Sequence, residues 1–67
     1  MPSCFTDGLT PTYDQGFAIG VEDACAGTAA DEAYKGWRSE SDEEIQCLYL
    51  GYEEGYYRGE NNPEYCD

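Results

Sequence analysis

Histidine is absent from this chain of 67 residues, and only three Lys and Arg stand against 15 Asp and Glu. The commonest general base and metal ligand is therefore missing. The net charge of −12 argues against direct binding to nucleic acid or to anionic membranes, because both are bound through Lys and Arg. No apolar run approaches the ~20 residues that a membrane span needs. We expect neither a nucleic acid nor a membrane as a direct partner.

The sequence also lacks the common motifs of catalytic and cofactor sites. It has no glycine-rich phosphate loop followed by Lys and no EF-hand run of acids. Neighbouring acids are abundant, but a catalytic carboxylate pair needs a substrate cleft. A single small domain over residues 1–67 has little room for one. We expect no enzymatic activity, no cofactor and no metal site, with a loose divalent-cation site on the acidic surface as an alternative.

The N-terminus lacks the cationic start and the apolar run of a secretory signal, so a cytoplasmic location is expected. The four cysteines are Cys4, Cys25, Cys47 and Cys66, which lie 21, 22 and 19 positions apart. Structural zinc sites use closely spaced pairs, which are missing here. The cytosol keeps thiols reduced. Reduced thiols are the favoured expectation, and one or two disulfides or a metal site are the alternatives.

What the chain does contain is enough apolar material to fold. It is 40 % hydrophobic and 15 % aromatic, which is more than an acidic disordered segment carries. Apolar residues recur at spacings of three and four, as on one face of a helix. We expect an all-α fold, a small bundle of two long antiparallel helices and one short helix. An irregular N-terminal lead-in and a polar C-terminal tail complete it.

The first long helix is expected to begin after Thr10 or Thr12. Pro11 suits the first turn of a helix, where its missing N–H is not needed. Ala26 and Gly27 are expected to end the helix, since glycine readily adopts the conformation of a helix C-terminus.

A short helix is expected over residues 29–37, with Thr28 as its cap. The second long helix is expected to follow Ser41, which forms a capping box with Glu44. Gly59 is expected to end it. Two residues are expected to tie down the remaining tail, Tyr65 and Cys66.

A glycine and aromatic pattern recurs in both long helices. Residues 16–21 (Gly-Phe-Ala-Ile-Gly-Val) match residues 51–56 (Gly-Tyr-Glu-Glu-Gly-Tyr) at a displacement of 35. Glycine costs about 1 kcal/mol relative to Ala inside a helix, so we interpret both pairs as sites of close helix packing. A ligand or a second chain approaching the glycines is the alternative. The expected packing sets Gly16 and Gly20 against Tyr49, Tyr52 and Tyr56, and Gly51 and Gly55 against Phe17 or Trp37.

The same pattern supports a resemblance. Tyr13-x-x-Gly16-Phe17-x-x-Gly20, Tyr34-x-Gly36-Trp37 and Gly51-Tyr52-x-x-Gly55-Tyr56 resemble the short two-helix ribosome modulation factor proteins. Glycine and aromatic residues of those proteins form a compact helical hairpin. They are basic and bind ribosomal RNA, whereas this chain carries the opposite charge. The resemblance therefore implies the hairpin and not the RNA-binding function.

The acidic residues are unevenly distributed. Residues 1–34 contain no cation, and residues 39–67 hold nine acids against Arg58 alone. A compact domain of this length is about 28 Å across, which gives about one net charge per 2.3 Å, while duplex DNA carries about one per 1.7 Å. The chain can therefore imitate a short piece of duplex. The alternative is an acidic surface that only keeps the protein soluble.

In size, charge and lack of histidine, the chain is similar to the small acidic anti-CRISPR proteins of phages, in particular the type I-C inhibitors. This resemblance implies a monomeric DNA mimic in the host bacterial cytoplasm that occupies the DNA-binding surface of a type I Cascade complex. The runner-up is an acidic adaptor or inhibitor of another basic host protein, such as a restriction, nucleoid or ribosomal protein. The residues expected to bind the partner are Asp31, Glu32, Asp42, Glu43, Glu44, Glu53, Glu54 and Tyr57.

Overall fold

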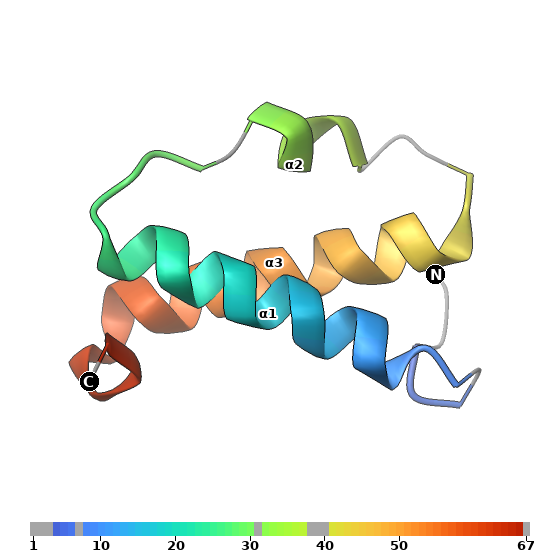
Figure 1. Cartoon of the computed structure of the whole chain (residues 1–67), viewed down its shortest axis with the longest axis horizontal. Helices are drawn as coiled ribbons and strands as arrows, with labels where there is room; N and C mark the ends of the chain where they lie inside the picture. The colour runs from blue at the N-terminus through green and yellow to red at the C-terminus, as the bar shows by residue number, and fades with distance from the viewer. Residues whose placement is uncertain (1–3, 7, 31, 38–40, 67) are drawn as a thin grey trace.

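The computed structural model describes residues 4–6, 8–30, 32–37 and 41–66. Three α-helices follow in order, α1 (Thr10–Cys25), α2 (Glu32–Trp37) and α3 (Glu43–Asn61), and a short 3₁₀ helix, η1 (Pro63–Cys66), comes last. No strand occurs in these described ranges. The expected all-α fold with two long helices and one short helix is therefore confirmed. Figure 1 shows α1 and α3 side by side, with α2 crossing above them.

Helix α1 begins close to its expected start but with a different cap. Leu9 occupies the cap position and no side chain caps the helix there, so neither Thr10 nor Thr12 acts as the cap. Pro11 lies in the first turn as expected. At the other end Gly27 adopts a positive φ of 72°, and its N–H donates to the carbonyl of Ala24 at 3.1 Å. The predicted stop is confirmed.

Helix α3 is capped by Asp42 and not by Ser41. The Asp42 carboxylate accepts a hydrogen bond from the Glu44 N–H at 2.8 Å, so the predicted Ser41 capping box is wrong by one residue. The helix also continues through Gly59 to Asn61. Gly59 is buried, and a Cβ built on it would lie 2.7 Å from the Cβ of Ala24 in α1. This glycine serves packing, not termination.

The short helix α2 is shorter than expected. It covers Glu32–Trp37, in place of residues 29–37. Thr28 does not cap it: the Thr28 carbonyl accepts a hydrogen bond from the Tyr56 hydroxyl at 2.7 Å. That bond fixes the chain after α1 against α3.

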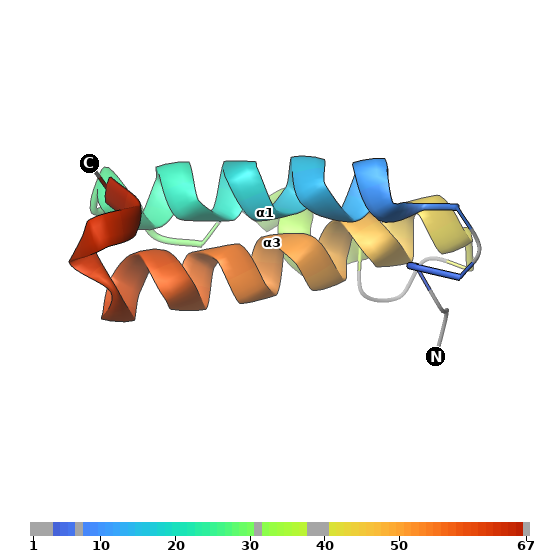
Figure 2. The same ribbon diagram turned by 90° about the horizontal axis from the view of Figure 1, so that it is seen from below.

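The two long helices run parallel, so the expected antiparallel hairpin is wrong. The colours of Figures 1 and 2 show that both helices advance from the same end of the molecule to the other. The chain between Gly27 and Asp42 carries α2 back along the length of the pair. Helix α1, with 16 residues, is about 24 Å long at 1.5 Å per residue. The connection is easily long enough to cover that distance at about 3.3 Å per residue.

Glycines bring the two helix backbones into direct contact. A Cβ on Gly16 would collide with the backbone of Leu48 and Tyr52, and a Cβ on Gly51 would collide with the backbone of Tyr13 and Phe17. The contacts follow the sequence repeat. Gly51 lies 35 positions after Gly16, and its partners Tyr13 and Phe17 lie 35 positions before the partners of Gly16. The close-packing interpretation is confirmed, but the partners are backbone atoms. Neither Tyr49 nor Trp37 is among the nearest atoms at these glycines.

Two disulfides close the helix pair at its two ends, one from the segment before α1 to α3 and one from α1 to η1. Cys4 pairs with Cys47 at the beginning of the helices, and Cys25 pairs with Cys66 at their far end, with Cα–Cα distances of 5.8 and 5.4 Å. The favoured expectation of reduced thiols is therefore wrong. One bond joins the beginning of α1 to the beginning of α3 and the other joins the two far ends, as only a parallel pair allows. The second disulfide also ties down the tail, as expected, together with the ring contact of Tyr65 and Phe17.

An aromatic cluster under α2 surrounds the buried Tyr52. Tyr52 of α3 is fully buried, and its hydroxyl donates to the Asp23 carboxylate of α1 at 2.5 Å. Tyr34 of α2 lies against both Tyr49 and Tyr52, with ring centroids 4.9 and 4.5 Å apart. Trp37 meets the Tyr52 ring edge-on at 6.1 Å. This cluster holds α2 on one side of the pair and leaves the outer surface of α3 uncovered.

Candidate partner-binding surface

Six of the eight predicted partner-binding residues belong to α3 or to its cap. Asp31 lies outside the described residues, as does the side chain of Glu32, the first residue of α2. The acidic first turn of α3 contains Glu43 and Glu44, both exposed. Asp42 uses its carboxylate to cap the helix. All three acids lie where the partial positive charge of a helix N-terminus favours them.

The remaining predicted residues lie in the second half of α3. Glu53 is exposed and Tyr57 retains 58 % of its surface. Glu54 is half-buried and accepts a hydrogen bond from Arg58 at 2.8 Å. This ion pair is solvent-exposed and contributes little to stability. The pair does place Arg58, the one cation of α3, beside Glu54, one of the predicted partner-binding acids.

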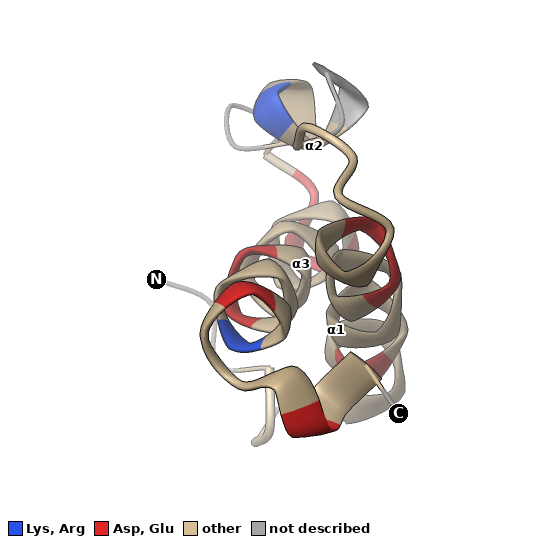
Figure 3. Cartoon of the chain, turned by 90° about the vertical axis from the view of Figure 1, so that its left-hand side faces the viewer, with Lys and Arg blue, Asp and Glu red and all other residues tan. Residues whose placement is uncertain are grey.

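Helical spacing brings several of these residues onto one side of α3. Positions separated by three, four, seven and eleven residues share a helix face. We call the following set the acidic face of α3: Glu43, Leu50, Glu53, Glu54 and Tyr57. Viewed from the end of the bundle, acidic positions are spread over both α1 and α3 (Figure 3). The structure therefore gathers four predicted residues on one face, namely Glu43, Glu53, Glu54 and Tyr57. Asp42 and Glu44 lie outside this set.

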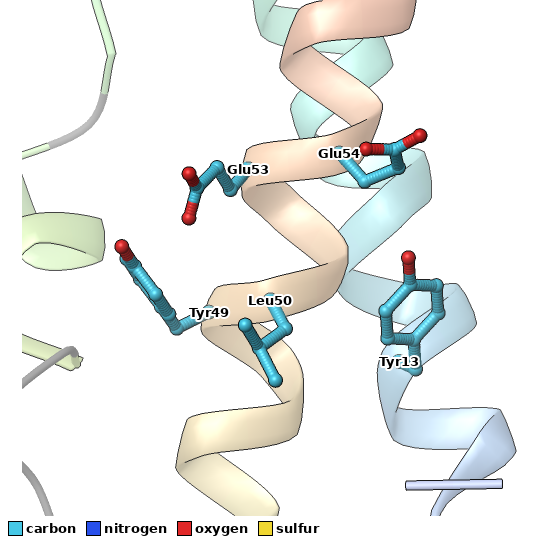
Figure 4. Close-up of a pocket in the computed structure, with 5 residues that line it drawn as sticks. All are labelled: Tyr13, Tyr49, Leu50, Glu53 and Glu54. Carbon is cyan, nitrogen blue, oxygen red and sulfur yellow. The ribbon is translucent and has the colours of Figure 1, made fainter. Parts of the chain in front are cut away.

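A hollow lies in the middle of the acidic face. It has a volume of about 450 Å³ and is lined by Tyr13, Tyr49, Leu50, Glu53 and Glu54. In Figure 4 the Leu50 side chain lies between the two tyrosine rings, with both carboxylates one turn further along α3. Tyr13 reaches the hollow from α1, and the other four residues belong to α3. We call it the tyrosine hollow.

Both tyrosines of the hollow keep their protons at neutral pH. A hydrogen bond with Glu53 is the main cause that raises the pKa of Tyr49 to about 12, and burial and Tyr34 add to it. Burial raises the pKa of Tyr13, with smaller contributions from Glu54 and Asp14 that outweigh the opposing effect of Arg58. The hollow therefore combines two neutral phenols, two carboxylates and one apolar side chain. Such a set can bind a cation that has an apolar stem.

Sequence reasoning predicted both acids of the hollow but not its tyrosines. Tyr13 entered the expectations only as part of the glycine and aromatic pattern, and Tyr49 only as a packing partner of Gly16 and Gly20. Tyr13 reaches the acidic face only because α1 runs parallel to α3 in this register. Tyr49 carried a signal in the sequence, since Glu53 follows it by one helical turn.

The described residues show neither a metal-binding cluster nor a membrane-spanning helix. Within the described ranges, no group of three or more His, Cys, Asp or Glu residues is placed to hold a metal ion. None of the described helices is long and apolar enough to cross a membrane. The acids of α3 are thus spread along a face and do not converge on a point.

No protein-family model, curated protein or solved structure matches this chain, so the acidic face and its hollow are the basis for inferring its function.

Proposed function

We propose that the chain is an acidic binding protein that occupies the Lys- and Arg-rich surface of a nucleic-acid-binding protein and so excludes the nucleic acid. The observation that carries this proposal is the acidic face of α3. It combines exposed carboxylates, which attract a basic surface over a distance, with the exposed Tyr57 and the half-buried Leu50, whose remaining surface can be buried on contact. The specific target we propose is the DNA-binding surface of a type I Cascade complex.

The dimensions of the molecule support imitation of a duplex. Its longest axis is 31 Å and its radius of gyration is 11.5 Å. Dividing 31 Å by the net charge of −12 gives about 2.6 Å per charge, against about 1.7 Å for duplex DNA. A Lys- and Arg-lined channel would therefore meet a comparable density of negative charge.

A second candidate is favoured by the two disulfides. Disulfides persist in oxidising compartments and are rare in the cytosol, whereas Cascade is an intracellular target. The paired cysteines support an acidic adaptor or inhibitor whose basic partner lies outside the reducing cytoplasm. The same face of α3 would bind that partner, so the two candidates differ in the target and not in the surface.

The first experiment measures duplex DNA binding by a purified type I Cascade complex, with the protein added at increasing concentration. The proposal predicts that DNA binding falls, that excess duplex restores it, and that inhibition weakens steeply between low and high salt because exposed charges are screened. Undiminished DNA binding at saturating protein would exclude Cascade as the target.

The second experiment separates the two candidates. The protein is expressed with and without export to an oxidising compartment, and the mass of the unreduced product is compared with that of the reduced one. A cytoplasmic product that lacks both disulfides and does not fold would exclude an intracellular target. A folded and inhibitory cytoplasmic product would favour Cascade.

A further inference from the structure

The tyrosine hollow has a polarity that selects its occupant. Its floor is Leu50 and its sides are the rings of Tyr13 and Tyr49. Glu53 and Glu54 lie one helical turn beyond the rings, Glu53 on the Tyr49 side of α3 and Glu54 on the Tyr13 side (Figure 4). An occupant must therefore place an apolar portion over Leu50 and a positive charge at the end where the carboxylates flank the hollow.

Among protein side chains, arginine fits this order of groups best. Its aliphatic stem can pack on an apolar floor while the charged head stays at the polar end. Its planar guanidinium stacks on aromatic rings and forms charge-assisted hydrogen bonds with carboxylates. Lysine has the stem and the charge but lacks the planar fork.

The chain already contains a small version of this contact. Arg58 donates to Glu54 at 2.8 Å from one turn further along α3. The same carboxylate lines the tyrosine hollow. Other occupants are disfavoured by charge, since an anion would meet two carboxylates and a second copy of this chain would carry a net charge of −12.

We propose that the tyrosine hollow takes the side chain of an arginine that the basic partner presents, and that this arginine fixes the register of the complex on α3. This inference rests on the proposed function, because it identifies which group of the partner the acidic face recognises. The remaining acids then attract the partner, and the hollow anchors it.

The test is a titration of the isotope-labelled protein with N-acetyl-arginine amide, followed by NMR. The control ligand is the corresponding citrulline amide, which has nearly the same shape but no charge. We expect saturable chemical-shift changes at residues of the tyrosine hollow with arginine and none with citrulline. Equal changes at Glu22 and Glu64, exposed acids that do not line the hollow, would show diffuse attraction and overturn the proposal.

A variant pair tests the hollow itself. Leu50→Lys fills it with a cation, and Ala18→Lys adds the same charge at an exposed position of α1. Circular dichroism verifies that both variants remain folded. We expect Leu50→Lys to weaken arginine binding at least about tenfold, the equivalent of one good contact, and Ala18→Lys to change it little. Equal effects of the two variants would overturn the proposal.

The outcomes keep this inference distinct from the proposed function. If Leu50→Lys inhibits the basic partner as well as the wild-type protein does, the arginine anchor is wrong and the general function stands. If the hollow binds arginine amide but the protein blocks no nucleic-acid-binding partner, the anchor stands and the proposed function is wrong.

Discussion

At the scale of residues, glycine is the residue type that the fold depends on most. Gly16, Gly20, Gly51 and Gly55 each lie where a Cβ would meet backbone atoms of the other long helix at less than 3.0 Å. Their importance was predictable, because paired glycines inside helices are costly and need a reason. Their contacts were not, because backbone contacts depend on helix direction and register.

Replacing Gly51 by Ala tests this packing. The added Cβ would collide with the carbonyl of Tyr13, and backbone cannot move aside cheaply. We expect a loss of about 2–3 kcal/mol in the free energy of unfolding, toward the upper end for overpacked cores. Gly36→Ala in α2 is the matched control, since its Cβ would meet nothing within 4 Å. It should be neutral or stabilising by up to about 1 kcal/mol. Similar urea midpoints for the two variants would contradict close packing.

The tyrosine hollow gives a second prediction at this scale. The pKa of Tyr49, about 12, lies above its ordinary value of 10.0 mainly because of the hydrogen bond with Glu53. The ¹³Cζ shift of Tyr49 should therefore titrate nearer pH 10 in Glu53→Ala. A raised pKa favours the protonated folded state, so this stabilisation is complete below pH 10 and is lost as pH rises toward 12. An unchanged titration in the variant would show that another group raises the pKa.

At the scale of elements, the direction of α3 relative to α1 is the main difference between expectation and structure. The 35-residue repeat and the even cysteine spacing are both compatible with a parallel pair. A hairpin was expected because short connections usually join antiparallel neighbours. The short helix α2 changes this, since it lies on the path by which the chain returns to the starting end. Helix α2 has only six residues, so its own sequence does not decide whether the chain turns back at once or crosses over. Tertiary contacts decide this, such as the stacking of Tyr34 on Tyr49.

The two disulfides differ in exposure, which predicts the order of their reduction. Cys4 and Cys47 are buried, while Cys25 and Cys66 are exposed. Thiol–disulfide exchange needs access to a sulfur atom, so a dithiol reductant should open Cys25–Cys66 first. Timed reduction, alkylation and peptide mass spectrometry would identify the order. Earlier or simultaneous opening of Cys4–Cys47 would contradict the packing at that end.

At the scale of the whole molecule, charge and shape were predictable in outline. The expected radius of gyration of roughly 11 Å compares with 11.5 Å in the structure. The acidic total follows from composition alone. The hollow did not follow, because it joins Tyr13 of α1 to four residues of α3. Only the parallel register brings them together.

The central claim is that one face of the molecule, not its total charge, binds the basic partner. The most direct test compares two double charge reversals, Glu43→Lys with Glu53→Lys on α3, and Asp14→Lys with Glu22→Lys on α1. All four residues are exposed, and both variants change the net charge equally. Glu54 is left in place because it holds Arg58.

The measurement is the dissociation constant for the basic partner, beginning with type I Cascade, at one fixed salt concentration. We expect the α3 variant to bind at least about tenfold more weakly than the wild-type protein, and the α1 variant to lose much less. Equal losses in both variants would contradict the claim, because they would show that the partner responds to net charge and not to the acidic face of α3.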